Sequence, residues 1–248
     1  MIILRSRQEI QKLGASNRIV AKVLQELREL VKVGVTTLEL DTYAERLMER
    51  MGATPAFKGY RGFPKTLCTS INEQVVHGIP GNRRLKEGDI LSIDTGVLYD
   101  GYYGDAAMTV GVGSISEGAA RLLRVTEEAL YLGIEQAREG NHLSDISHAI
   151  QSHAEGAGFS VVREYVGHGI GAKLHEEPQV PNFGPPGRGP LLKAGMVLAI
   201  EPMINVGGSD VETLPDNWTV VTADRSLSAH FEHTIAITED RAVILSKE

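Results

Sequence analysis

Five acidic or histidine residues near the ends of strand-like apolar segments are the candidates for a chemical function. The set consists of Asp94, Asp105, His168, Glu201 and Glu232. Four carboxylates carry four negative charges and one imidazole is neutral, so two divalent cations would balance the set. An oxygen-rich set with a single imidazole favours manganese, iron, cobalt or zinc. Two such ions about 3.5–4 Å apart can hold and activate a bridging water for hydrolysis.

Two of these acids occupy matching positions in an internal duplication. The segment from Leu85 to Asp94 aligns without gaps with the segment from Leu192 to Glu201, at an offset of 107 (201 − 94). Each copy reads as a turn, a buried strand and a terminal carboxylate. Because a buried acid is costly unless it is paired or bound to a metal, the repeat predicts one site between two similar halves.

Asp94 and Asp105 flank a predicted β-hairpin. A turn centred between Tyr99 and Asp100 would place the two aspartates directly opposite each other, with Cβ atoms about 5 Å apart. Two like charges at that distance destabilise each other, and one would protonate unless a cation lay between them. The hairpin therefore predicts a pair of metal ligands.

His168 and Glu232 complete the predicted ligand set. His168 lies in the segment 167–171, where glycines on both sides let the backbone approach a neighbour closely. Glu232 shares a strand face with His230 and Thr234, because side chains alternate along a strand. Each residue alone has an ordinary explanation, as a turn aspartate, a structural histidine or a surface acid. The combination, and above all the duplicated acids, favours a metal site.

The elements that would position these residues also occur twice. Apolar residues at helical spacing predict helices over Ser6–Leu30 and Thr37–Met51, the second with Thr36 or Thr37 as N-cap. The same pattern predicts helices over Glu117–Arg138 and Ser144–Glu155. The order predicts an α+β fold, with an antiparallel sheet and helices packed on one side. Strands are expected at Leu67–Ile71, Ile90–Val97, Tyr103–Val112, Val161–Tyr165, Val197–Ile204, Trp218–Thr222, Phe231–Thr238 and Ala242–Leu245.

The composition is that of an ordinary soluble globular protein, with 42% hydrophobic and 23% charged residues among 248. We expect a single domain, residues 1–248, made of two related halves of about 1–115 and 116–248. The net charge of −7 argues against a nucleic-acid surface spread over the whole protein. Cys68 is the only cysteine, which excludes an intrachain disulfide and suits a reducing compartment. No run approaches the ~20 apolar residues of a membrane span, so we expect a cytoplasmic protein.

Six short sequence motifs resemble those of type I methionine aminopeptidase, a peptidase family with the pita-bread fold. The motifs are Ser70–Pro80, Asp94–Gly96 with Asp105, Gly167–Gly171, His175–Pro178, Ile200–Met203 and Phe231–Thr234. The resemblance implies a pseudo-twofold α+β fold, with a curved antiparallel sheet and helices on its outer face. It also implies a monomeric, cytoplasmic dinuclear metallo-exopeptidase. Such an enzyme removes the initiator methionine from nascent proteins and peptides when the second residue is small.

The family's roles carry over to the matching residues of this sequence. The five acidic and imidazole residues would hold two divalent ions, cobalt, manganese, iron or zinc. Glu201 would also be the general base for the bridging water that attacks the first peptide carbonyl. His77 and His175 would contact the substrate amide and the tetrahedral intermediate. The methionine pocket would involve Tyr60, Phe63, Cys68, Leu174 and Trp218, and a monovalent-cation site would involve Asn72, Gln74 and Ser228.

Two other functions fit parts of this pattern. A proline-specific peptidase of the same fold usually carries a large N-terminal domain, which this sequence lacks, and a sulfur-friendly pocket would be unexpected in it. A peptide-binding module without metals would not be expected to retain all five ligands and both auxiliary histidines. Peptides beginning Met-Ala-Ser or Ala-Pro would separate the two enzymes, and metal analysis would identify the binding module. The resemblance also suggests the ribosome as a partner, although the sequence shows no docking motif.

Overall fold

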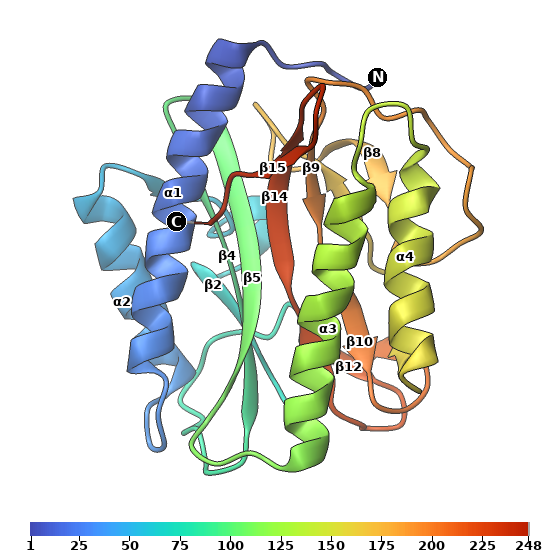
Figure 1. Ribbon diagram of the computed structural model, residues 1–248. Coiled ribbons are helices and arrows are strands. Elements are labelled where there is room, and N and C mark those ends of the chain that lie inside the picture. Colours follow the sequence, from blue (N-terminus) through green and yellow to red (C-terminus); the bar gives the residue numbers. More distant parts are fainter. Residues whose placement is uncertain (248) are drawn as a thin grey trace.

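The computed structural model describes residues 1–247 as a large sheet covered on one side by two pairs of helices (Figure 1). Helices α1 (Arg7–Leu30) and α2 (Thr37–Arg50) lie over one half of the sheet. Helices α3 (Glu117–Gln136) and α4 (Leu143–Gly156) lie over the other half. All four predicted helices are confirmed, with each end within two residues of its predicted position. Within residues 1–247, no helix is both long and apolar enough to cross a membrane.

Local capping explains why the first two helices begin where the sequence predicts. The Ser6 side chain accepts the backbone N–H of Glu9, and the Glu9 carboxylate accepts the backbone N–H of Ser6 at 2.8 Å. Thr36 and Glu39 form the same reciprocal pair at the start of α2. Such capping boxes satisfy backbone donors that the first helical turn leaves free. Both depend on residues three apart, so they are visible in the sequence.

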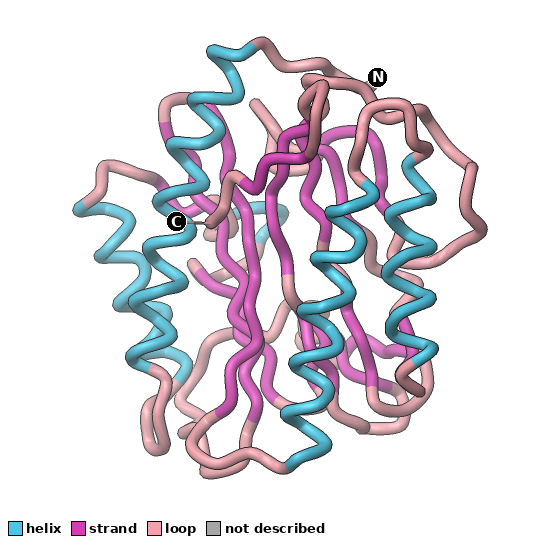
Figure 2. The backbone as a smooth tube through the Cα atoms, in the orientation of Figure 1, coloured by secondary structure: helices cyan, strands magenta, loops and turns pink. Residues whose placement is uncertain are grey.

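The large sheet contains nine strands in the order β1-β4-β5-β14-β9-β7-β8, with β15 paired to β14 and β2 paired to β4. Two three-stranded sheets, β13-β10-β6 and β11-β12-β3, complete the described part of the fold (Figure 2). The strands are β1 (Thr54–Pro55), β2 (Leu67–Ile71), β3 (Gln74–Val76), β4 (Ile90–Tyr99), β5 (Tyr102–Gly111), β6 (Ser160–Val161), β7 (Gly167–Gly169), β8 (Glu176–Val180), β9 (Val197–Ile200), β10 (Met203–Asn205), β11 (Val211–Thr213), β12 (Val220–Thr222), β13 (Ser228–His230), β14 (Glu232–Ile237) and β15 (Ala242–Ile244).

One predicted strand is wrong in one respect, because the chain leaves one sheet and enters another within it. The predicted strand Val197–Ile204 divides at Glu201 and Pro202 into β9 of the large sheet and β10 of a small sheet. Proline has no N–H to donate and cannot continue a central ladder. The predicted strand Phe231–Thr238 is confirmed as β14 to within one residue at each end, and Phe231 lies where the chain passes from β13 of that small sheet to β14 of the large sheet. Two of the predicted ligands, Glu201 and Glu232, therefore lie where the chain changes sheets.

Another prediction, the strand Val161–Tyr165, is confirmed only at its start, because β6 ends at Val161. The predicted strand Trp218–Thr222 begins two residues later, at Val220. The Asp216 carboxylate accepts the backbone N–H groups of both Trp218 and Thr219, at 2.9 and 2.8 Å. A side chain that bonds to its own local backbone in this way competes with a strand ladder.

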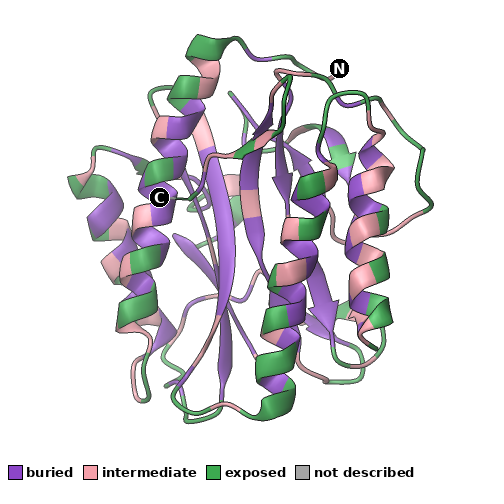
Figure 3. Ribbon diagram, viewed as in Figure 1, coloured by how far each residue is buried: buried purple, intermediate pink, exposed green. Residues whose placement is uncertain are grey.

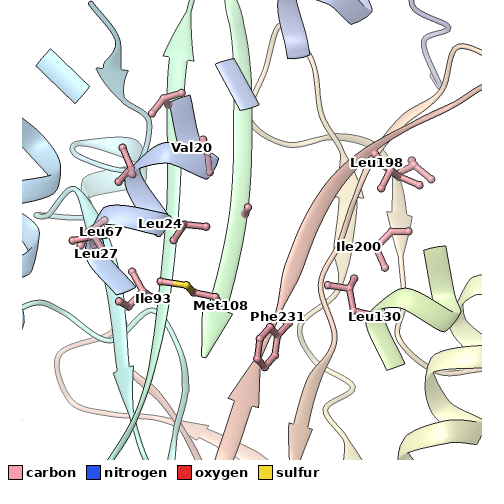
Figure 4. Close-up of a cluster of buried hydrophobic side chains, with 14 of the residues drawn as sticks. Val20, Leu24, Leu27, Leu67, Ile93, Met108, Leu130, Leu198, Ile200 and Phe231 are labelled. Atoms are coloured by element: carbon pink, nitrogen blue, oxygen red, sulfur yellow. The ribbon is translucent and has the colours of Figure 1, made fainter. Parts of the chain in front are cut away.

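The main hydrophobic core fills the space between the helices and the sheet (Figures 3 and 4). Each of the four helices carries both buried and exposed residues, as the colours of Figure 3 show. Fully burying one aliphatic side chain contributes roughly 1.5–3 kcal/mol, so this layer fixes the sheet firmly against both helix pairs. Core members drawn in Figure 4 include Val20, Leu24, Leu27, Ile93, Met108, Leu130, Leu198, Ile200 and Phe231.

Candidate active site

One residue from each of five neighbouring strands lines the same cleft. In sheet order, strands β4, β5, β14, β9 and β7 contribute Asp94, Asp105, Glu232, Glu201 and His168. Glu201 directly follows the last residue of its strand. The cleft has a volume of about 370 Å³. On β4 the neighbours Ile93 and Val97 belong to the core beneath the helices, so Asp94 projects from the opposite face of the sheet.

The predicted register of the β4–β5 hairpin is wrong by two residues. Asp94 pairs with Ala107 and Asp105 pairs with Gly96, so the two aspartates are diagonal neighbours. The cause is the turn, which is formed by Asp100 and Gly101 with φ values of 49° and 79°. Two consecutive residues with positive φ form the tight hairpin turn that an Asp-Gly pair favours. A shift of two residues preserves the face, so both carboxylates still point into the cleft.

Four of the five side chains are linked by short distances. Ligand atoms of Asp105, His168 and Glu232 all lie within 4.8 Å of one another. The Nε2 atom of His168 lies 3.5 Å from Oε1 of Glu201 and 3.9 Å from Oδ2 of Asp105. Asp94 lies outside that closest group, yet it lines the same cleft and its charge raises the pKa of Glu201 and Glu232.

The carboxylates of the cleft fit divalent cations by the chemistry of their atoms. Within residues 1–247, Oδ1 of Asp94, Oδ1 of Asp105 and Oε1 of Glu232 are buried without a hydrogen-bond partner. Burial raises the pKa of Asp94 to about 7. Burial and then repulsion between the acids raise the pKa values of Asp105, Glu201 and Glu232 well above their usual range. Buried, unpaired oxygens of this kind are the ligands that hard cations require.

His168 is neutral and presents one nitrogen to the cleft. Burial, followed by repulsion from His175, lowers the pKa of His168 to about 3. Its Nδ1 lies 2.9 Å from the carbonyl oxygen of Gly169. In the neutral ring Nδ1–H donates to that oxygen, which leaves the Nε2 lone pair for a cation.

The glycines on both sides of His168 allow close approach of the backbone, as the sequence predicts. A Cβ at Gly167 would lie 2.3 Å from the carbonyl oxygen of Ala199. A Cβ at Gly169 would lie 2.2 Å from the carbonyl oxygen of Glu177. Any larger residue would push β7 away from its two neighbouring strands and move His168 with it.

Two further imidazoles, His77 and His175, lie at the cleft. Burial and repulsion from His175 lower the pKa of His77 to about 4. Burial and the nearby charge of Arg61 lower the pKa of His175. The ring centres of His175 and His168 are 4.3 Å apart, and the Tyr60 hydroxyl lies 2.8 Å from Nδ1 of His175. Both imidazoles are therefore neutral near pH 7 and can donate hydrogen bonds.

An apolar pocket adjoins the acidic group. The rings of Phe63 and Trp218 meet edge to face with centres 5.1 Å apart. Cys68 is buried, and burial raises the pKa of its thiol well above the usual range, so the thiol is neutral and behaves as a small apolar group. All five pocket residues predicted from the sequence line the cleft, namely Tyr60, Phe63, Cys68, Leu174 and Trp218.

The residues expected at a monovalent-cation site lie on adjacent segments away from the acids. Ser228 donates its backbone N–H to the carbonyl oxygen of Asn72 at 2.9 Å. The side-chain oxygens of Asn72 and Gln74 accept backbone N–H groups, from Ile90 at 2.9 Å and from Ile71 at 2.8 Å. The structure thus joins Asn72 to Ser228, and it uses both amide side chains to hold local backbone.

Sequence reasoning missed several residues of the cleft. Arg61, Tyr165 and Gln179 line it, and the Tyr165 ring centre lies 5.4 Å from that of His77. His230 lies just beyond it, with Nε2 3.8 Å from Oε2 of Glu201. The position of His230 two residues before the predicted ligand Glu232 was the sequence signal that could have identified it as a residue near the site. By contrast, nothing local to Tyr165 relates it to a cleft, because its neighbours there come from distant parts of the chain.

Comparison with known proteins agrees with this geometry. Residues 11–239 match the model of metallopeptidase family M24. The chain therefore belongs to metallopeptidase family M24, and its fold is the pita-bread fold of that family.

Relatives that align over nearly the whole chain show to which group within the family it belongs. The chain is 56% identical over 247 residues to methionine aminopeptidase 1 of Bacillus subtilis, covering 100% of both chains. It superposes on methionine aminopeptidase of Thermotoga maritima with a TM-score of 0.99 and 47% identity, covering 100% of both. For the enzyme of Rickettsia prowazekii the TM-score is 0.98 at 44% identity, covering 99% of this chain and 100% of that one. Within the family the chain belongs with the methionine aminopeptidases.

Proposed function

We propose that this protein hydrolyses the first peptide bond of peptides and nascent proteins that begin with methionine followed by a small residue. The observation that carries the proposal is the convergence of four carboxylates, two of them buried and two partly buried, and a neutral imidazole beside an apolar, aromatic pocket. The acidic group suits metal-dependent hydrolysis. The pocket suits an unbranched thioether, since sulfur makes favourable contacts with aromatic rings.

Two divalent ions, cobalt, manganese, iron or zinc, would be held by Asp94, Asp105, His168, Glu201 and Glu232. When bound, they supply a Lewis acid and lower the pKa of water. The support is the charge balance of the five side chains and the buried carboxylate oxygens without partners within residues 1–247. We also propose that Asn72, Gln74 and Ser228 mark a monovalent-cation site.

Glu201 would be the general base. Its carboxylate lies at the end of β9, where Pro202 turns the chain into another sheet, and Asn182 donates to its backbone carbonyl at 3.1 Å. Burial and neighbouring acids raise the pKa of Glu201, so the carboxylate can accept the proton of the water that attacks the first carbonyl.

His77 and His175 would bind and polarise the scissile amide. Both are neutral at pH 7 because their pKa values are lowered, so each can donate an N–H without charging first. A donor aimed at the developing oxyanion strengthens as charge accumulates on it. The methionine side chain would enter between Tyr60, Phe63, Cys68, Leu174 and Trp218.

We further propose that the chain works as one catalytic domain of two related halves, residues about 1–115 and 116–248. The order helix, helix, strands occurs in both, and the inner strands β5 and β14 of the two halves pair with each other. We propose a monomer that acts in the cytoplasm, where nascent chains emerge, with the ribosome as a partner.

Activity on a peptide series tests the proposal. Metal-stripped protein, reconstituted with each of the four metals, should cleave Met-Ala-Ser and should leave Ala-Pro peptides intact. Glu201→Gln should fold normally and lose about 10²–10⁴-fold in kcat, the range for a general base. Glu29→Gln, an exposed change on α1, is the matched control. Near-normal turnover by Glu201→Gln would remove this residue from the base role.

A further inference from the structure

A buried ion pair joins the segment before α1 to the loop that carries His175. The guanidinium Nη2 of Arg5 bonds to Oε2 of Glu176, and the two side chains are only 6% and 10% exposed. Neither residue takes part in the proposed chemistry. A buried ion pair is weak evidence for stability, because desolvation offsets much of its attraction. The role of the Arg5–Glu176 pair therefore has to be inferred from the residues around it.

Glu176 ties the end of the loop to its middle. It immediately follows His175 and begins β8. Its second carboxylate oxygen, Oε1, accepts the backbone N–H of Lys173 at 3.0 Å. Leu174 and His175, which both line the cleft, lie between the two residues joined in this way. One carboxylate thus holds the short segment that carries them.

Gly171 provides the space that the guanidinium occupies. A Cβ there would lie 2.1 Å from Nη2 and 2.6 Å from Cζ of Arg5. The glycine also starts the loop, since its N–H donates to the carbonyl of Lys173 at 3.1 Å and its carbonyl accepts the N–H of Tyr103 at 2.9 Å. The guanidinium therefore packs against the beginning of the loop and bonds to its end.

Arg5 is itself held by parts of the fold outside the loop. Its backbone N–H donates to the carbonyl of Gly195 at 2.7 Å. Its Nη1 lies 3.4 Å from Oε1 of Glu9 on α1, and the same oxygen accepts the Tyr102 hydroxyl of β5 at 3.1 Å. The frame formed by α1 and β5 thus fixes the guanidinium before it reaches Glu176.

We propose that Arg5 is a positioning residue for His175. It acts through Glu176 to hold the loop so that the His175 ring keeps the position in the cleft that hydrolysis needs. The proposal rests on the role proposed above for His175. On the cleft side, His175 has the Tyr60 hydroxyl as a neighbour, and the Arg5–Glu176 pair holds the loop from the other side. Glu176 also pairs with Gly169 of β7, next to the proposed ligand His168, but Arg5 holds Glu176 through its side chain and bonds to no proposed ligand. Loss of the Arg5–Glu176 pair should therefore lower turnover much more than it lowers metal affinity.

Kinetics of Arg5→Met in the full-length, metal-loaded protein test the proposal. We expect kcat on Met-Ala-Ser to fall on the order of tenfold or more, because small misplacements of a catalytic group have large effects. Calorimetric titration of the stripped protein with Mn²⁺ should give an affinity within about twofold of wild type. Arg124→Met, which removes an exposed ion pair with Glu128 on α3, is the matched control and should change neither quantity.

Combination with His175→Ala separates positioning from general support of the fold. In that background Arg5→Met should cause no further loss, because the group that it positions is gone. An equal loss in both backgrounds, or a parallel loss of Mn²⁺ affinity, would overturn the proposal. If His175→Ala itself leaves kcat unchanged, the role proposed for His175 fails. If His175→Ala lowers kcat and Arg5→Met does not, only the positioning role fails.

Gly171→Ala provides a second, independent perturbation that keeps both charges. Its methyl group would displace the guanidinium, so kcat should fall in the same direction as for Arg5→Met, with little further loss when the two changes are combined. Gly118→Ala on α3, where a Cβ meets only the Ser116 hydroxyl at 4.0 Å, is the control. If Arg5→Met does not fold, Arg5→Lys serves instead, since it keeps the charge and loses the forked geometry. Wild-type kcat for Gly171→Ala would contradict the proposal.

Discussion

Asp94→Asn should change how the stability of the metal-free protein depends on pH. Asp94 lies on β4 at the cleft, and its Oδ1 atom is buried without a hydrogen-bond partner within residues 1–247. Burial raises the pKa of its carboxyl from 3.8 to about 7. The folded protein therefore keeps a proton on Asp94 over a pH range in which the unfolded chain has lost it.

The sign and the size of the effect follow from this difference. Because the folded state binds the extra proton, the contribution of Asp94 to stability is fully present below about pH 4 and is lost as the pH rises through about 7. The two pKa values differ by 3.2, from 7 and 3.8, and each pH unit corresponds to about 1.36 kcal/mol. The loss is thus about 4 kcal/mol at most, since the residue is only partly covered at the cleft. Asparagine has no proton to lose.

Urea unfolding in the presence of a chelator measures this loss. The free energy of unfolding of wild type minus that of Asp94→Asn should fall by up to about 4 kcal/mol between pH 4 and pH 8. The comparison of wild type with the variant is needed because buried histidines change the free energy of unfolding in the opposite direction as the pH rises. Burial lowers the pKa of His230 to about 3, so that ring destabilises the fold as the pH falls, in both proteins alike. Added Mn²⁺ should restore wild type above pH 7 more than it restores the variant. A difference that stays flat within about 1 kcal/mol over this range would refute the reasoning.

Three further changes test separate parts of the site. His77→Ala should lower turnover about 10²-fold or more and leave the metal content measured by elemental analysis unchanged; equal loss of both would make His77 a ligand. Gly101→Ala should cost about 1 kcal/mol or more in urea unfolding, because its φ of 79° is unfavourable for any residue with a Cβ. Gly81→Ala, where a Cβ would meet only the Ile79 carbonyl at 3.9 Å, is its control. Gly169→Ala should weaken Mn²⁺ binding by the stripped protein, since its methyl would collide with the Glu177 carbonyl 2.2 Å away; unchanged affinity would show that β7 can shift without moving His168.

The parts of the fold that the sequence predicts well depend on neighbours in the chain. Ser6 and Thr36 begin helices because a glutamate three residues later completes each cap. Strand β2 agrees with its prediction at both ends. The hairpin register was also locally encoded, in the pair Asp100-Gly101, and the error came from centring the turn one residue too early. Such an error is corrected by turn chemistry alone.

Other features depend on contacts between distant segments and could not be predicted in this way. Strand β9 stops at Ile200 because the following residues pair with β13 and β6 in another sheet. His230 lies near Glu201 because two separate crossings between sheets occur side by side. The ion pair of Arg5 with Glu176 spans 171 positions of the sequence, and no periodic pattern signals it.

The order of the strands explains why a site of this kind arises at the junction of a duplication. Strands β4 and β5 come from the first half, and β14 and β9 from the second, so the pairing of β5 with β14 joins the two halves. Asp105 and Glu232 lie on these two strands, on either side of that junction, and Asp94 and Glu201 lie on the next strands outward. Neighbouring strands are about 4.8 Å apart, so carboxylates on successive strands must repel one another unless something positive lies between them. The same spacing that makes this acidic group unfavourable by itself suits the binding of divalent cations between the strands, and such binding would hold the halves together.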